Sequence, residues 1–150
     1  MLVRFGGKMS QLLVQQYLNE LDRLRKFSGS LTEQVIREAF KDLLKNWARQ
    51  KNLHFISELD YRTGLKTTVR PDGTVLHDLR VPLGYWEAKD TADDLDEEIQ
   101  KKFKRGYPQD NIIFSDDVTA VLIQHKEEVL RCDMTDTTRL ERLLKLFFSF

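Results

Sequence analysis

Apolar residues recur at helical spacing in four stretches of the chain. Residues 9–27 predict a first amphipathic helix, and the pattern Ser30-Leu31-Thr32-Glu33 predicts the capped start of a second helix that reaches Trp47. A third helix, capped by Asp93 or Asp94, is predicted to run to about Arg105 and to end at Gly106. Residues 136–148 predict a last one.

Shorter apolar runs bounded by turn residues fill the segments between these helices. They predict strands over residues 53–59, 65–70, 84–89, 111–115, 118–124 and 127–132. Residues 60–64 and the Asp72-Gly73 dipeptide are interpreted as turns. The alternation of helices and strands predicts an α/β fold with a mixed central sheet flanked by helices, in which residues 84–89 form the central strand.

The composition is that of a single globular domain. Of 150 residues, 41% are hydrophobic and 32% are charged. No apolar run is long enough to span a bilayer and no targeting segment opens the chain, so we expect a cytoplasmic protein without a membrane partner. The apolar end Leu146–Phe150 indicates an amino-terminal piece of a longer multidomain protein. The single Cys132 excludes an internal disulfide and is expected to be a small buried residue.

Charge balance leaves two interpretations open for the third predicted helix. With 24 basic and 24 acidic residues the chain has no global positive field, so any DNA binding must be local. The cations that follow the acidic segment 90–98 could be solvated partners of helix acids, or they could border a cleft and contact DNA phosphates. They are Lys101, Lys102, Lys104 and Arg105, and Tyr107 is a further candidate DNA contact.

Chemistry is concentrated around the predicted central strand. Glu87 and Lys89 lie on one face of this strand, about 7 Å apart, because side chains alternate. If the preceding strand pairs beside it, the carboxylate of Asp78 can meet that of Glu87. Two carboxylates with room for water suit Mg²⁺, which would polarise a phosphate and lower the pKa of a bound water. Lys89 would hold that water and offset negative charge.

This arrangement, Asp78 followed by Glu87-Ala88-Lys89, resembles the PD-(D/E)XK nuclease superfamily. More narrowly, the chain is similar over about residues 30–124 to the Mrr-like nuclease domain of bacterial restriction enzymes that join a nuclease to a DNA methylase. The similarity extends to Thr32-Glu33, to Tyr85-Trp86 and to the segment from Lys102-Phe103 to Pro108. The motif's Pro-Asp dipeptide is present as Pro71-Asp72, and Asp72 is kept as the alternative to Asp78.

The resemblance implies a restriction-endonuclease-like αβββαβ core and a metal-dependent endodeoxyribonuclease. Mg²⁺ would be the cofactor, with Mn²⁺ able to substitute, and the substrate would be double-stranded DNA. Other domains of the same polypeptide would be its partners, namely a methylase, a target-recognition domain and, as in some of the resembled enzymes, a helicase. A double-strand break would need a dimer or two visits.

Secondary site residues follow from the same resemblance. It implies that Glu33 contributes to the active site, although Glu33 also fits a helix cap, and Glu38 is a weaker alternative. Gln100 is either a contributor near the metal or a solvent-facing helix residue. His54, His77 and His125 lack ligand-like spacing and are expected to be structural or surface residues.

A second class of function stays open beside the nuclease. In this alternative the domain has a nuclease fold, binds nucleic acid or a partner protein, and does not cleave. A glycosidase with paired carboxylates is set aside because the motif region lacks an aromatic sugar platform. No Gly-rich phosphate loop occurs, so ATP use is not predicted for this chain.

Overall fold

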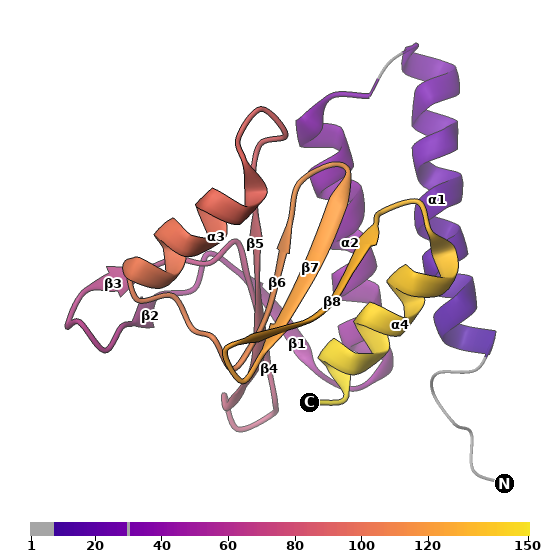
Figure 1. Ribbon diagram of the computed structural model, residues 1–150. Coiled ribbons are helices and arrows are strands. Elements are labelled where there is room, and N and C mark those ends of the chain that lie inside the picture. Colours follow the sequence, from indigo (N-terminus) through magenta and orange to yellow (C-terminus); the bar gives the residue numbers. More distant parts are fainter. Residues whose placement is uncertain (1–7, 30) are drawn as a thin grey trace, which may run out of the picture.

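The computed structural model of the chain describes residues 8–29 and 31–150. It is a mixed α/β structure built around a six-stranded sheet with helices on both faces, as the sequence predicted (Figure 1). The elements are α1 (Lys8–Ser28), α2 (Glu33–Gln50), β1 (His54–Ser57), β2 (Tyr61–Arg62), β3 (Thr68–Val69), β4 (Gly73–Leu76), β5 (Pro82–Ala88), α3 (Leu95–Lys104), β6 (Asn111–Ser115), β7 (Thr119–Gln124), β8 (Glu127–Asp133) and α4 (Thr137–Phe148). Among the described residues, no helix is long and apolar enough to cross a membrane.

The strand order of the sheet is β1-β4-β5-β6-β7-β8. Neighbouring strands are antiparallel except for β5 and β6, which are parallel and are joined through α3, as a parallel connection requires. Leaving out the small β2–β3 pair, the elements α2, β1, β4, β5, α3 and β6 follow the αβββαβ order. The fold is therefore restriction-endonuclease-like.

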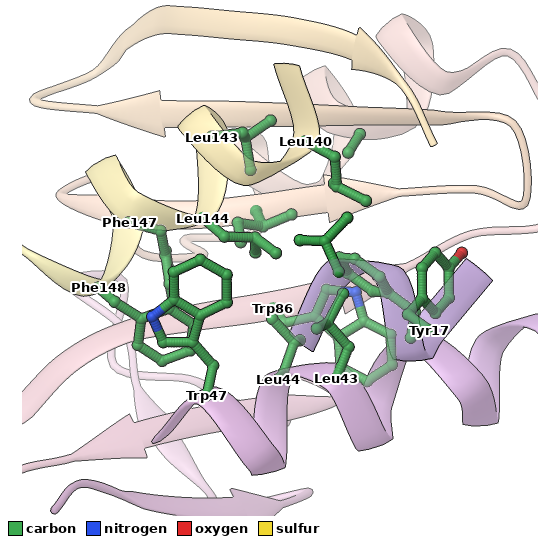
Figure 2. Close-up of a cluster of buried hydrophobic side chains, with 14 of the residues drawn as sticks. Tyr17, Leu43, Leu44, Trp47, Trp86, Leu140, Leu143, Leu144, Phe147 and Phe148 are labelled. Carbon is green, nitrogen blue, oxygen red and sulfur yellow. The ribbon is translucent and has the colours of Figure 1, made fainter. Parts of the chain in front are cut away.

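Two apolar clusters lie on opposite faces of the sheet. Helices α1, α2 and α4 cover one face and α3 covers the other (Figure 1). In the larger cluster, Trp47 stacks on Phe148 with ring centroids 5.5 Å apart (Figure 2). Trp86 of the central strand packs edge-on against Phe40 of α2. Tyr85, the neighbour of Trp86, packs in the smaller cluster beneath α3. Glu87 is two residues after Tyr85 and shares its face.

Short-range capping explains where the helices begin and end. The Thr32 hydroxyl accepts a hydrogen bond from the Val35 amide and caps α2, so Glu33 is the first residue of the helix. The predicted cap Ser30 lies outside the described residues. Asp94 caps α3 as expected, and Gly106 follows its last turn at a φ of 93°, a conformation that glycine adopts without strain.

The strand predictions were least accurate between residues 57 and 84. Instead of a strand over 65–70, only Thr68–Val69 is extended, and it pairs with Tyr61–Arg62 inside the segment predicted as a turn. The predicted turn at Asp72-Gly73 is wrong, because Gly73 is the first residue of β4 and pairs with Trp86. A glycine is needed there, since a Cβ would lie 2.3 Å from the Phe55 ring.

The apolar carboxy-terminal segment packs onto the sheet. Phe147 and Phe148 are buried in the larger cluster, whereas Phe150 is 44% exposed and contacts the ring of His125. Cys132 is buried and unpaired, as expected for a small core residue.

Candidate active site

Asp72 and Glu87 lie opposite each other at the same end of the sheet. Gly73 pairs with Trp86 in the antiparallel β4–β5 ladder, which places the preceding Asp72 beside Glu87. The Asp72 amide donates a hydrogen bond of 3.1 Å to Glu87 Oε1, and the Ala88 amide donates one of 2.7 Å to Asp72 Oδ2. Backbone and carboxylates of the two strands therefore hold both acids in place.

Asp78 does not meet Glu87, so that part of the sequence prediction is wrong. Asp78 lies in the turn between β4 and β5, where the His77 amide donates to the Val81 carbonyl. Since Glu87 is near the other end of β5, the length of the strand separates them by about 17 Å. The exposed Asp78 carboxylate instead lies 2.8 Å from Nε2 of His54 on β1. Asp72, the alternative acid of the sequence motif, lies beside Glu87 where Asp78 was expected.

Glu87 is buried and has a cationic partner. Lys102 of α3 places Nζ 2.9 Å from Glu87 Oε2, and the Tyr107 hydroxyl donates to the same oxygen at 3.4 Å. The Lys102 ammonium also lies 4.8 Å from the centre of the Tyr107 ring. Burial and the neighbouring Asp72 carboxylate raise the pKa of Glu87, and the bonds from Lys102 and the Asp72 amide offset part of this effect. Burial and the Glu87 carboxylate raise the pKa of Tyr107 to about 12.

Lys89 reaches a carboxylate on the helix above the sheet. Its Nζ lies 3.2 Å from Glu98 Oε2 of α3, and both side chains are largely buried. This hydrogen bond from Lys89 is the main reason that the pKa of Glu98 is lowered. The Lys89 amide also donates to the Ser115 carbonyl on β6, which fixes the strand end beyond Glu87.

The structure brings Glu33 to this end of the sheet, but not Gln100. Glu33 Oε1 accepts a hydrogen bond of 3.1 Å from the Thr91 amide in the loop after Lys89. Gln100 is exposed on α3, two residues from both Glu98 and Lys102, and so on the opposite side of the helix. Glu38 is exposed on α2, where Gln34 donates to its carboxylate.

The predicted DNA contacts on and after α3 fall into two groups. Lys101, Lys104 and Arg105 are exposed, with Lys101 Nζ 3.4 Å from Glu98. Lys102 and Tyr107 are buried against Glu87, so they are not the surface contacts that the sequence suggested. The contact of Lys102 with Glu87 was not predicted from the sequence. The signal available was the position of Lys102 three residues after Ile99, on the face of the helix that packs on the sheet.

Two adjacent carboxylates fit a magnesium site better than a closed metal cage. Among residues 8–29 and 31–150, no group of three or more His, Cys, Asp or Glu side chains is placed to hold a metal ion. Mg²⁺ keeps several waters and is commonly held by one or two carboxylates together with substrate phosphates. The donor set of Asp72 and Glu87 matches that requirement.

Comparison with known proteins gives a solved structure that is similar to this chain. A chain in the cryo-EM structure of a DrdV–DNA complex matches 93% of this chain at 46% sequence identity, with a TM-score of 0.86. The match covers 14% of the length of that chain. No family model matches this chain, and no curated protein does.

Proposed function

We propose that this chain is the Mg²⁺-dependent DNA-cleaving module of a restriction enzyme, a member of the PD-(D/E)XK nucleases. The observation that carries the proposal is the pairing of Asp72 with Glu87 across two strands, with Lys89 two residues further along. The similarity to a protein in complex with DNA supports DNA as the substrate. Such a module would act in the cytoplasm.

In this proposal each residue has a separate role. Asp72 and Glu87 hold the metal ion, which when bound would polarise the scissile phosphate and lower the pKa of an attacking water. Lys89, once it leaves Glu98, positions that water and offsets negative charge on the phosphate. Glu33 keeps the loop after Lys89 attached to α2 through its bond to Thr91. Gln100 has no role in this scheme because it faces away from the two acids.

The remaining activities of the enzyme would belong to other domains. This chain corresponds to a small part of the DrdV chain. We therefore propose that methylation and target recognition are supplied by other domains of the same polypeptide. One site of this kind cuts one strand, so a double-strand break would need two copies or two visits.

A non-catalytic domain is the second candidate, and one observation favours it. Glu87 and Lys89 each already form an ion pair, with Lys102 and Glu98 respectively. A domain that only binds nucleic acid or a partner protein could keep these pairs permanently. The cleaving module must exchange both when it binds metal and DNA.

Plasmid cleavage by the complete protein that contains this chain separates these candidates. We expect nicking and linearisation in Mg²⁺, none in EDTA, and a loss of about 100-fold or more in Asp72→Asn, Glu87→Gln and Lys89→Ala. Asp78→Asn is the matched control, because it removes an exposed carboxylate at the far end of β5 from Glu87. It should cleave at least as well as the parent does, since it only removes a negative charge that would repel DNA. Full activity in all three site variants would refute the nuclease assignment, and a loss in Asp78→Asn alone would reinstate Asp78.

A further inference from the structure

One face of α2 carries a row of four cations. Arg37, Lys41, Lys45 and Arg49 are spaced four residues apart, so they follow one another along the same side of the helix. Successive members are separated by about 6 Å along the axis, and the row is about 18 Å long. The end that carries Arg37 is the end nearest the candidate active site, since the Arg37 guanidinium lies 3.1 Å from Asp90, just after Lys89.

The row borders a groove between α2 and the edge of the sheet. Two adjacent hollows form this α2–β1 groove, with volumes of about 290 Å³ and about 730 Å³. They share no lining residue among the described ones, but Lys41 of the first hollow is one helical turn from Lys45 of the second, so they follow each other along α2. Asp72, Arg37 and Lys41 all line the first hollow. The second is lined by Lys45, Arg49 and the His54–Asp78 pair, among others. The groove therefore leads from a candidate metal ligand along the cationic row.

The ion pairs of the described residues include Arg37 but not the other three members of the row. Within the described part of the chain, Lys41, Lys45 and Arg49 form no ion pair, although Glu38 and Glu58 also line the first hollow. At the end of α3, Lys101 and Lys102 contact carboxylates, whereas Lys104 and Arg105 form no ion pair among the described residues. Like charges four residues apart on a helix repel each other, so such a row destabilises the folded state. A polyanionic ligand would remove that repulsion.

We infer that the α2–β1 groove binds the phosphodiester backbone of one strand of a DNA duplex and leads it to Asp72. This inference rests on the proposed nuclease function and adds the path of the substrate. Each of the four cations can contact one phosphate of the strand. Contacts of this kind position the duplex without reading its sequence. The neutral chain then binds DNA through a local surface on α2, and not through the α3 cations that the sequence suggested.

The salt dependence of DNA binding tests this path. The complete protein is titrated onto a fluorescein-labelled DNA duplex in EDTA, and the affinity is measured by anisotropy at several salt concentrations. Each phosphate contact contributes about 0.9 to the slope of log K against log salt, so the triple variant Lys41→Gln/Lys45→Gln/Arg49→Gln should lose about 2.7 from that slope. Glutamine keeps part of each stem, and the variant's circular dichroism and melting temperature show that it is folded.

A charge-matched variant on α3 makes the test specific. Lys101→Gln/Lys104→Gln/Arg105→Gln removes the same charge from the other face of the sheet and should keep most of the slope. An unchanged slope in the α2 variant, or equal losses in both variants, would overturn the inference. Because binding is measured without Mg²⁺, this result is independent of plasmid cleavage. If the parent protein cleaves DNA and its α2 variant keeps the full salt dependence of binding, the nuclease proposal remains valid and the DNA path along the groove is refuted.

Discussion

At the scale of single residues, the Glu87–Lys102 pair is the main electrostatic feature of the candidate site. Both side chains are buried, and their ion pair must offset the cost of removing two charges from water. The Asp72 carboxylate adds repulsion on the other side of Glu87, so the charged form of Glu87 is disfavoured. A divalent cation between the two acids would relieve this repulsion, which is a physical reason to expect one.

The pH dependence of the free energy of unfolding should reveal the unfavourable burial of the Glu87 charge beside Asp72. An acid whose pKa is higher in the folded state keeps more protons when folded, so the free energy of unfolding falls as pH rises from its ordinary value of 4.5 through the folded value. Glu87→Gln removes this titration. In EDTA, the free energy of unfolding of the parent minus that of the variant should therefore decrease as pH rises, as measured by urea denaturation.

Asp133→Asn provides a control of opposite sign. Thr135 donates hydrogen bonds to the Asp133 carboxylate from its hydroxyl and its amide, and these bonds lower the pKa of Asp133. The stability that Asp133 contributes is present above its unfolded pKa and lost at lower pH, so the parent-minus-variant difference should increase with pH. A pH-independent difference for Glu87→Gln would contradict the raised pKa.

Part of the candidate site could be predicted from the sequence, but the acid that lies beside Glu87 could not. The pair Glu87 and Lys89 followed from strand alternation, which is a local property of the chain. The choice between Asp72 and Asp78 depended on the register of β4 against β5, and that register depends on a long-range contact. Only Gly73 lets the Phe55 ring approach so closely, and the sequence does not show that the two residues meet.

At the scale of elements, side-chain amides attach α4 to the sheet. Asn111 Nδ2 of β6 donates to the carbonyls of Leu83 and Phe147, at 3.1 Å and 2.9 Å. Gln124 of β7 donates to Asn111 Oδ1 and to the Leu146 carbonyl. These bonds satisfy backbone carbonyls near the end of α4 and hold its aromatic residues against β5.

Gly84 is the position where this attachment is most sensitive to added volume. A Cβ at Gly84 would lie 2.6 Å from both Asn111 Nδ2 and the Phe147 ring, so Gly84→Ala must displace α4 or β5. We expect the free energy of unfolding to fall by about 1–3 kcal/mol in urea denaturation. Gly64→Ala is the control, because nothing lies within 4 Å of its Cβ position, and equal effects of the two changes would contradict this account.

Element predictions succeeded where the signal was local. The amphipathic helices and strands β6, β7 and β8 follow from periodicity and caps, for example Asp94 at α3. The segment around residues 60–70 failed because its short strands pair only with each other, and so have too few residues for a period to show. The cationic row on α2 was readable in the sequence, but its groove was not, since β1 supplies the other wall.

At the scale of the whole molecule, net charge conceals an uneven surface. The chain is neutral, with 24 cations and 24 acids. Within the described residues, Glu98 and Lys102 of α3 form ion pairs, whereas Lys41, Lys45 and Arg49 of the α2 row form none. The two faces of the sheet would then have different roles. The α3 face holds Glu87 and Lys89 through ion pairs, while the α2 face offers cations to a polyanion. The candidate metal ligands lie at the sheet end where both helices begin.

Metal binding by the whole protein distinguishes a cleaving module from a domain that only binds. A ligand at 100 times its Kd stabilises the folded state by about 2.7 kcal/mol if it does not bind the unfolded chain. We expect the unfolding midpoint of the protein to rise in saturating Mg²⁺ relative to EDTA. Asp72→Ala should abolish this shift, and Asp78→Ala should retain it. A parent protein with no shift, in the presence and in the absence of DNA, would mean that Lys102 holds Glu87 permanently and that the domain does not cleave.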